Sequence, residues 1–156
     1  MNMPDPRDFF PPLPWREEKR ILFHITPIEY LSSIQHEGLQ LTVEGTRTGA
    51  VTKPLFGKKL RPIFLALNPK HAIVIAVEAF RNGNVISPEW ALLQVELPSH
   101  ILLFPDPFFP FKGSFYTLQA IQPQFITVKK MVDVSDIQKV RAYVRELREE
   151  RGREKG

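Results

Sequence analysis

The chain contains no cysteine, which excludes disulfide bridges and thiolate metal ligands. It also lacks an apolar run near the roughly 20 residues that a membrane-spanning helix needs. Acidic residues and prolines interrupt the first 15 residues, unlike a secretory signal. The four histidines have no partners at metal-ligand spacing. We therefore expect a cytoplasmic protein with no membrane partner and no bound metal.

Acidic side chains are missing from one long stretch. The net charge is +4, but residues 45–76 contain no Asp or Glu. Such a one-signed stretch favours an anionic partner, a phosphate or a nucleic acid. The alternative is a solvated loop balanced by acidic residues elsewhere. The candidate substrate-binding residues in it are Arg47, Lys53, Lys58, Lys59 and Arg61.

Proline separates an expected arm from an expected domain. Residues 1–18 hold Pro4, Pro6, Pro11, Pro12 and Pro14, which oppose regular structure. Hydrophobic residues make up 43% of the 156, enough for one core. We expect an N-terminal arm over 1–18, a single domain over 19–150 and a charged tail over 151–156.

Hydrophobic periodicity predicts six strands, and capping signals predict three helices. The expected N-caps are Thr26, Asn68 and Ser135, and Gly38 is expected to end the first helix. Residues 44–61 and 104–113 are expected to be loops. The strands outnumber the helices and cluster late, which favours an α+β fold over a doubly wound sheet. The expected strands are residues 19–25, 39–43, 62–67, 90–97, 115–120 and 125–132.

The order of several short motifs resembles the ADP-ribosyltransferase fold. His24-Ile25-Thr26, a short helix and then Glu37-Gly38-Leu39 resemble the H-x-T … G-L opening of that family. Residues 62–72 and 90–98 resemble two of its core strands. Residues 120–131 (AIQPQFITVKKM) resemble its I-x-P-x-x-I strand. The resemblance spans residues 20–132 and implies split, mostly antiparallel sheets with short helices, beside the C-terminal helix expected here.

This resemblance implies that NAD is the co-substrate. In the family, the histidine of the first strand, here His24, holds the nicotinamide ribose, and its neighbours bind the nicotinamide amide. The Gly38-Leu39 turn would shape the cleft, and the strand that begins at Phe64 would form its walls together with Phe80. Tyr116 is a further candidate, to stack on the nicotinamide or to orient a ribose, and the alternative is an ordinary aromatic residue of a strand. The implied cofactor-binding residues are therefore His24, Ile25, Thr26, Gly38, Leu39, Phe64, Phe80 and Tyr116.

One residue of the family pattern is missing. Many members carry a glutamate on a late strand, but residues 114–119 (SFYTLQ) contain no carboxylate. Ser114 and Gln119 can bond a ribose hydroxyl, so they join His24 as catalytic candidates. Neither stabilises a cation as a carboxylate does. Glu96, on the preceding strand, is a possible substitute.

The resemblance leaves several functions open. The first is a mono-ADP-ribosyltransferase acting on a nucleic acid or a protein, as the DNA-modifying toxin branch of the fold does on DNA. A second is an inactive member that only binds such partners. A third is an RNA 2′-phosphotransferase, whose arginine and glycine positions are here Phe23 and Ile25. A structural protein with an interface rich in proline and phenylalanine is the fourth.

Overall fold

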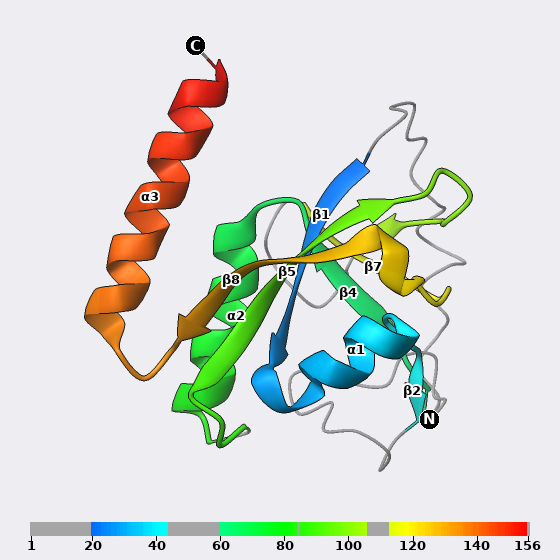
Figure 1. Ribbon diagram of the computed structural model, residues 1–156, viewed down its shortest axis with the longest axis horizontal. Coiled ribbons are helices and arrows are strands. Elements are labelled where there is room, and N and C mark those ends of the chain that lie inside the picture. The colour runs from blue at the N-terminus through cyan, green and yellow to red at the C-terminus, as the bar shows by residue number, and fades with distance from the viewer. Residues whose placement is uncertain (1–19, 44–59, 84, 106–112, 156) are drawn as a thin grey trace.

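The computed structural model describes residues 20–43, 60–83, 85–105 and 113–155 (Figure 1). Six strands form one sheet in the order β6-β7-β4-β1-β5-β8, and every described pairing is antiparallel. A second sheet pairs β2 (Thr42–Val43) with β3 (Leu60–Arg61). The expected α+β class is thereby confirmed. The six strands are β1 (Arg20–Pro27), β4 (Ile63–Ala66), β5 (Glu89–Leu97), β6 (Phe104–Pro105), β7 (Ser114–Thr117) and β8 (Ile126–Asp133).

Three α-helices and two 3-10 turns complete the described chain. They are η2 (Ile28–Tyr30), α1 (Leu31–Glu37), α2 (Pro69–Arg81), η3 (Pro123–Phe125) and the C-terminal α3 (Ile137–Lys155). Helix α2 begins as the sequence predicts. The Asn68 side chain accepts a hydrogen bond from the backbone N–H of Lys70 at 3.0 Å, and Pro69 takes the first helical position. None of the helices in the described ranges is long and apolar enough to cross a membrane.

Thr26 does not cap the first helix, so that prediction was wrong. Strand β1 continues through Pro27, and Thr26 pairs with Ala91 of β5 in an extended conformation. Its hydroxyl donates to the Pro27 carbonyl at 3.4 Å, and the helical segment begins only at Ile28. The backbone ladder with β5 therefore takes precedence over the local capping signal.

Ser135 does not cap the last helix either. Its hydroxyl donates to the Asp133 carboxylate at 2.5 Å. The carboxylate of Asp136 instead accepts from the backbone N–H groups of Gln138 at 3.1 Å and Lys139 at 3.2 Å. Asp136 immediately precedes the first helical residue, and an anion there also interacts favourably with the helix dipole.

The strand bounds differ from the sequence prediction mainly after β7. The predicted strand 115–120 ends at Thr117, where the Thr117 hydroxyl accepts from the backbone N–H of Gln119 at 3.2 Å. Of the predicted strand 39–43, only Thr42–Val43 is a strand, and the predicted loop 44–61 ends in β3.

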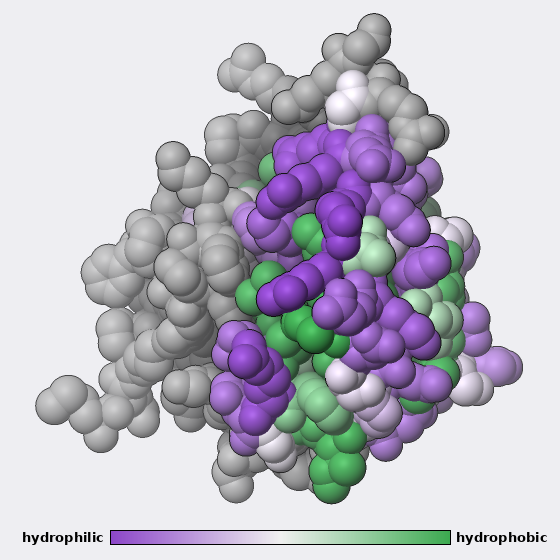
Figure 2. All heavy atoms as spheres, turned by 90° about the vertical axis from the view of Figure 1, so that its left-hand side faces the viewer, coloured by the Kyte–Doolittle hydropathy of each residue, from purple (hydrophilic) through white to green (hydrophobic). Residues whose placement is uncertain are grey.

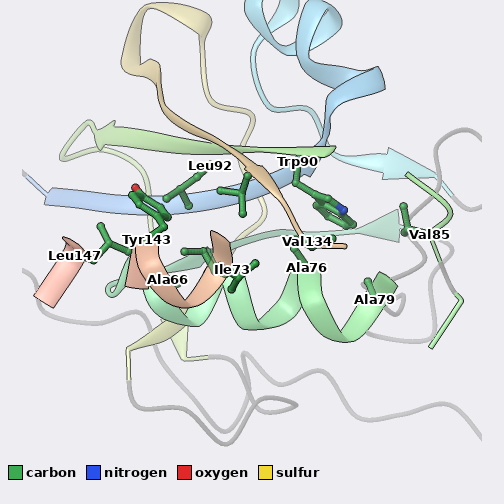
Figure 3. Close-up of a cluster of buried hydrophobic side chains, with 13 residues drawn as sticks. Ala66, Ile73, Ala76, Ala79, Val85, Trp90, Leu92, Val134, Tyr143 and Leu147 are labelled. Atoms are coloured by element: carbon green, nitrogen blue, oxygen red, sulfur yellow. The ribbon is translucent and has the colours of Figure 1, made fainter. Parts of the chain in front are cut away.

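The large sheet has a hydrophobic core on each face. Helices α2 and α3 pack on one face, where Trp90 and Leu92 of β5 meet Ile73, Ala76 and Tyr143 (Figure 3). On the other face, α1 contributes Ile34 to a second cluster that includes Leu22 and Leu93. Figure 1 shows α1 and α2 on opposite sides of the sheet.

The two edges of β1 are bonded very differently. Along β5, all eight residues of β1 have partners, from Arg20 with Leu97 to Pro27 with Trp90. Along β4, the register contains the single pair Phe23 with Ala66. The backbone ladder between β1 and β4 is therefore reduced to this pair, and we call the interrupted ladder beside it the gap between β1 and β4.

Candidate functional site

His24 follows Phe23, the residue of β1 that makes the single register pair with β4. Its backbone pairs with Leu93 of β5, on the fully bonded edge. Its ring nitrogen Nδ1 lies 2.8 Å from the backbone carbonyl oxygen of Phe64 in β4. Since a carbonyl oxygen only accepts, we assign the proton to Nδ1. The imidazole thus connects the two strands where the backbone ladder does not.

The environment of His24 favours a neutral ring. Burial lowers the pKa of His24 below 6.5, while its hydrogen bond to the Phe64 carbonyl raises the pKa by a smaller amount. At neutral pH the ring is therefore uncharged, and with the proton on Nδ1 the other nitrogen, Nε2, is a hydrogen-bond acceptor. Such a group suits a ligand that presents a hydroxyl.

A cavity of about 60 Å³ lies beside His24. Its lining is mostly apolar, with His24 and Ser114 as the polar residues, and it includes no carboxylate among the described residues. Drug-sized ligands occupy pockets of about 300–1,000 Å³, so the gap has to widen before it holds more than part of a ligand. The lining residues are Phe23, His24, Ile25, Phe64, Leu65, Ala66, Ala72, Ile75, Trp90 and Ser114.

Four of the predicted site residues meet at this cavity. They are His24 and Ile25 of β1, Phe64 of β4 and Ser114 of β7. The sheet register explains their meeting, because Ala66 pairs with Phe23 on one side and with Ser114 on the other. Three strands that are distant in sequence thus bring the predicted residues together.

Tyr116, Phe80 and Thr26 do not line the described cavity. Tyr116 is fully buried, and its ring stacks on Phe104 at 5.3 Å between centroids and lies 6.3 Å from Phe64. Phe80 is in the last turn of α2, packed against the core on that face. Thr26 is buried within the β1–β5 ladder.

Gly38 and Leu39 lie at the end of α1 and do not line the described cavity. Leu39 exchanges two backbone hydrogen bonds with Ile121, each 2.9 Å long. Gly38 has a φ of 80°, and a Cβ there would lie 2.0 Å from the Ile121 carbonyl oxygen. These two residues therefore join α1 to the segment before η3.

The Gln119 side chain is hydrogen-bonded to the segment that precedes β6. Its side-chain oxygen accepts from the backbone N–H of Leu102 at 2.7 Å, and the cavity beside His24 does not include it. Glu96, the possible substitute for a catalytic glutamate, is exposed and pairs with Ile21. Of the late-strand candidates, Ser114 alone lines the described cavity.

The predicted substrate-binding residues fall mostly outside the described residues. This holds for Arg47, Lys53, Lys58 and Lys59. The backbone of Arg61 belongs to β3 and pairs with Thr42. Their role in binding a substrate stays a prediction.

Sequence reasoning did not select Ala72, Ile75 and Trp90 as site residues. The sequence pattern predicted burial of Ala72 in a helix and of Trp90 in a strand, and Trp90 is buried with its indole N–H donating to the Ser87 carbonyl at 3.0 Å. Ala72 and Ile75 reach the cavity from α2 and Trp90 reaches it from β5, so the tertiary packing of both elements brings them there. No signal within the linear sequence indicates that packing.

Comparison with known proteins identifies no family. No protein-family model matches the chain, and no curated protein is significantly similar to it in sequence. Within the described ranges, no group of three or more His, Asp or Glu side chains is arranged to hold a metal ion. The functional argument therefore rests on the site itself.

Proposed function

We propose that this protein is an NAD-dependent mono-ADP-ribosyltransferase that holds the nicotinamide ribose beside His24. The observation that carries the proposal is the position of His24 in the gap between β1 and β4, with Nδ1 2.8 Å from the Phe64 carbonyl oxygen. The sequence motifs around His24 support the same assignment independently of the gap. The acceptor is a nucleic acid or a protein.

The chemistry of the cavity suits one end of NAD. A neutral His24 with the proton on Nδ1 offers Nε2 to a ribose hydroxyl, and the hydroxyl of Ser114 is a second polar group. The apolar wall, including Phe64 and Trp90, suits a flat ring. Binding requires β1, β4 and α2 to move apart, because the cavity of about 60 Å³ is smaller than the ligand.

The proposed reaction is a substitution at the ribose. The bond between nicotinamide and ribose breaks, nicotinamide leaves with the electron pair, and an acceptor nucleophile bonds to the same carbon and loses a proton. The ribose becomes cation-like on the way, and no carboxylate among the described cavity residues stabilises it. Catalysis would therefore depend on fixing ribose and acceptor together, and we expect it to be slow.

The test is NAD binding measured by calorimetry, followed by transfer of radiolabel from NAD. We expect His24→Ala to abolish detectable binding. His24→Asn keeps an N–H donor for the Phe64 carbonyl but loses Nε2, so it should weaken NAD binding at least tenfold while the fold persists. The matched control is His36→Ala, because His36 is exposed and bonded to the Ser32 carbonyl of its own helix at 2.8 Å. An unmodified protein that does not bind NAD would refute the proposal.

A second candidate is an inactive member of the same fold that only binds its partners. The lack of a carboxylate among the described cavity residues favours it. It predicts NAD binding without label transfer, or partner binding without NAD. Transfer that depends on His24 would exclude this candidate.

A further inference from the structure

A second hollow, of about 530 Å³, opens on the face of the sheet that carries α2 and α3. It lies between the start of α2, the C-terminal half of α3 and strands β1, β5 and β8. Figure 2 shows this side of the molecule, where hydrophobic side chains come to the surface between hydrophilic ones. We call this hollow the α2–α3 groove.

The rim of the α2–α3 groove is positively charged. Four cationic residues line it, and Glu150, which pairs with Lys129 at 3.5 Å, is the sole acidic residue among its described lining. No described residue forms an ion pair with the other three. The four are Lys70 at the start of α2, Lys129 of β8, and Arg148 and Arg151 one turn apart on α3.

His71 lies close to two of these positive charges. It follows Lys70 in the first turn of α2. Burial lowers the pKa of His71, and the charges of Lys70 and Arg151 lower it further. The two cations therefore act at the same place although they are 81 positions apart in the sequence. An anion in the groove would meet both of them.

The floor of the groove is apolar. Ile21 and Leu67 are large hydrophobic side chains that remain 42% and 46% exposed, and the half-buried ring of Phe23 lies with them. Apolar surface left open beside cations suits a partner that is both anionic and rich in flat apolar groups. Phosphates alone would use the rim and leave this floor exposed.

We propose that the α2–α3 groove binds single-stranded nucleic acid. Its phosphates would contact Lys70, Arg148 and Arg151, and an unpaired base would pack on the floor. Single-strand binding sites combine a cationic track with aromatic side chains on which bases stack, and Phe23 is the aromatic residue among the described lining of this groove. A duplex fits less well, because its bases are stacked inside and a concave groove cannot reach them. An acidic peptide supplies the charge but no flat rings for the floor.

The α2–α3 groove adjoins the proposed NAD site. Phe23 lines both the groove and the cavity beside His24. A strand bound in the groove would thus end near the ribose, in position to act as the ADP-ribose acceptor. That acceptor role rests on the proposed function, whereas binding of the strand does not.

The first experiment measures fluorescence anisotropy of a labelled oligothymidylate of about 12 nucleotides, without NAD. Three phosphate contacts on a single strand predict a slope of log affinity against log salt near −2. The double variant Arg148→Glu/Arg151→Glu should bind at least tenfold more weakly. The control Arg141→Glu/Arg145→Glu changes charge equally on exposed positions of α3 outside the groove, and should stay within about threefold.

A second variant separates binding from folding. Lys70 is exposed at the second position of α2, where an acidic residue interacts favourably with the helix dipole. Lys70→Glu should therefore keep or raise the melting temperature while it weakens oligonucleotide binding and reduces the salt slope by about 0.7. If Lys70→Glu and the double variant both bind the oligonucleotide as tightly as the parent protein does, the groove assignment is overturned. Tighter binding of a duplex or of a polyglutamate peptide would overturn the assigned partner.

NAD calorimetry on the same samples separates the two proposals. If the oligonucleotide binds in the groove and NAD does not bind, the proposed function fails and the groove assignment stands. If NAD binds and the oligonucleotide does not, the groove assignment fails alone. If both bind, label transfer to the oligonucleotide that falls in the double variant supports the acceptor role. Transfer that the double variant leaves unchanged would refute it.

Discussion

The two edges of strand β1 differ in backbone pairing: the edge toward β5 is fully paired, and the edge toward β4 is largely unpaired in register. Toward β5, each of its eight residues has a partner, and many of these positions are fully buried apolar side chains. Toward β4, one register pair remains, and the imidazole of His24 bridges to the Phe64 carbonyl nearby. The same strand thus carries part of the core and part of the candidate site.

The pair His24 and Leu93 illustrates the difference. Both residues occupy one register position of the β1–β5 ladder. Leu93 is fully buried in the core on the α1 face, whereas His24 is partly exposed and bonded across the gap. We infer that a functional group can be placed at mid-sheet because the opposite edge of its strand supplies the stability.

The largest expected effect is on the closed edge. Leu93→Ala removes a fully buried side chain and leaves a cavity, so we expect the free energy of unfolding to fall by about 3 kcal/mol. Urea denaturation measures it. A loss below about 1 kcal/mol would show that the β5 edge does not carry the stability assigned to it.

A smaller loss of stability is expected from a substitution at the end of α1, away from the gap between β1 and β4. Gly38→Ala forces a side chain onto a φ of 80° and against the Ile121 carbonyl oxygen. We expect a loss of about 2 kcal/mol in the free energy of unfolding, from strain and displacement of the backbone. Where the variant folds, its NAD affinity should equal that of the parent. Weaker NAD binding by a folded variant would bring the Gly38-Leu39 turn back into the site.

Substitutions at the edge of β1 that faces β4 should lower the free energy of unfolding by a smaller amount. His24→Ala leaves the Phe64 carbonyl without this partner, which we expect to cost about 1 kcal/mol. His24→Asn should recover part of that loss because its amide can donate to the same oxygen. Thermal unfolding of both variants beside the parent measures the difference. A His24→Ala loss as large as that of Leu93→Ala would remove the contrast between the two edges.

The smallest effect is on the pH dependence of stability. The pKa of His24 is lowered by burial, so the unfolded chain binds a proton more readily than the folded one near pH 6.5. The stability that the neutral His24 ring contributes to the folded protein is fully present above the unfolded pKa of 6.5. It is lost as the pH falls through the folded pKa. His71 acts in the same direction, through burial and the charges of Lys70 and Arg151.

Denaturation between about pH 5 and 7 tests this dependence, above the range where most carboxylates titrate. His24→Asn should make stability vary less with pH, and adding His71→Asn should reduce the variation further. A parent protein whose stability rises on acidification over this range would contradict the assigned direction.

The sequence predicts the fold well where local signals and burial agree. Asn68 caps α2 as its spacing indicates, and the apolar run around Leu92 is a central strand. Thr26 and Ser135 also carry capping signals, but the β5 ladder holds Thr26 and the Asp133 carboxylate binds Ser135. Local signals fail where pairing with a distant segment or a competing neighbour satisfies the same groups.

The candidate site is predicted in part. His24, Phe64 and Ser114 meet at one cavity because β1, β4 and β7 are neighbours in the sheet. The motif cannot distinguish a residue that lines a cleft from one that supports it, and so Gly38 was selected as well. Nor does the sequence reveal that Lys70 and Arg151 act together, because α3 returns across the sheet to reach α2.

The measurement that tests the central claim most directly is calorimetric titration of NAD into the parent protein and into His24→Asn. The account predicts saturable binding by the parent. It also predicts binding at least tenfold weaker in His24→Asn, whose melting temperature stays close to that of the parent. Equal affinities in the two proteins, or no binding by the parent, would contradict the assignment of the gap between β1 and β4 as an NAD site.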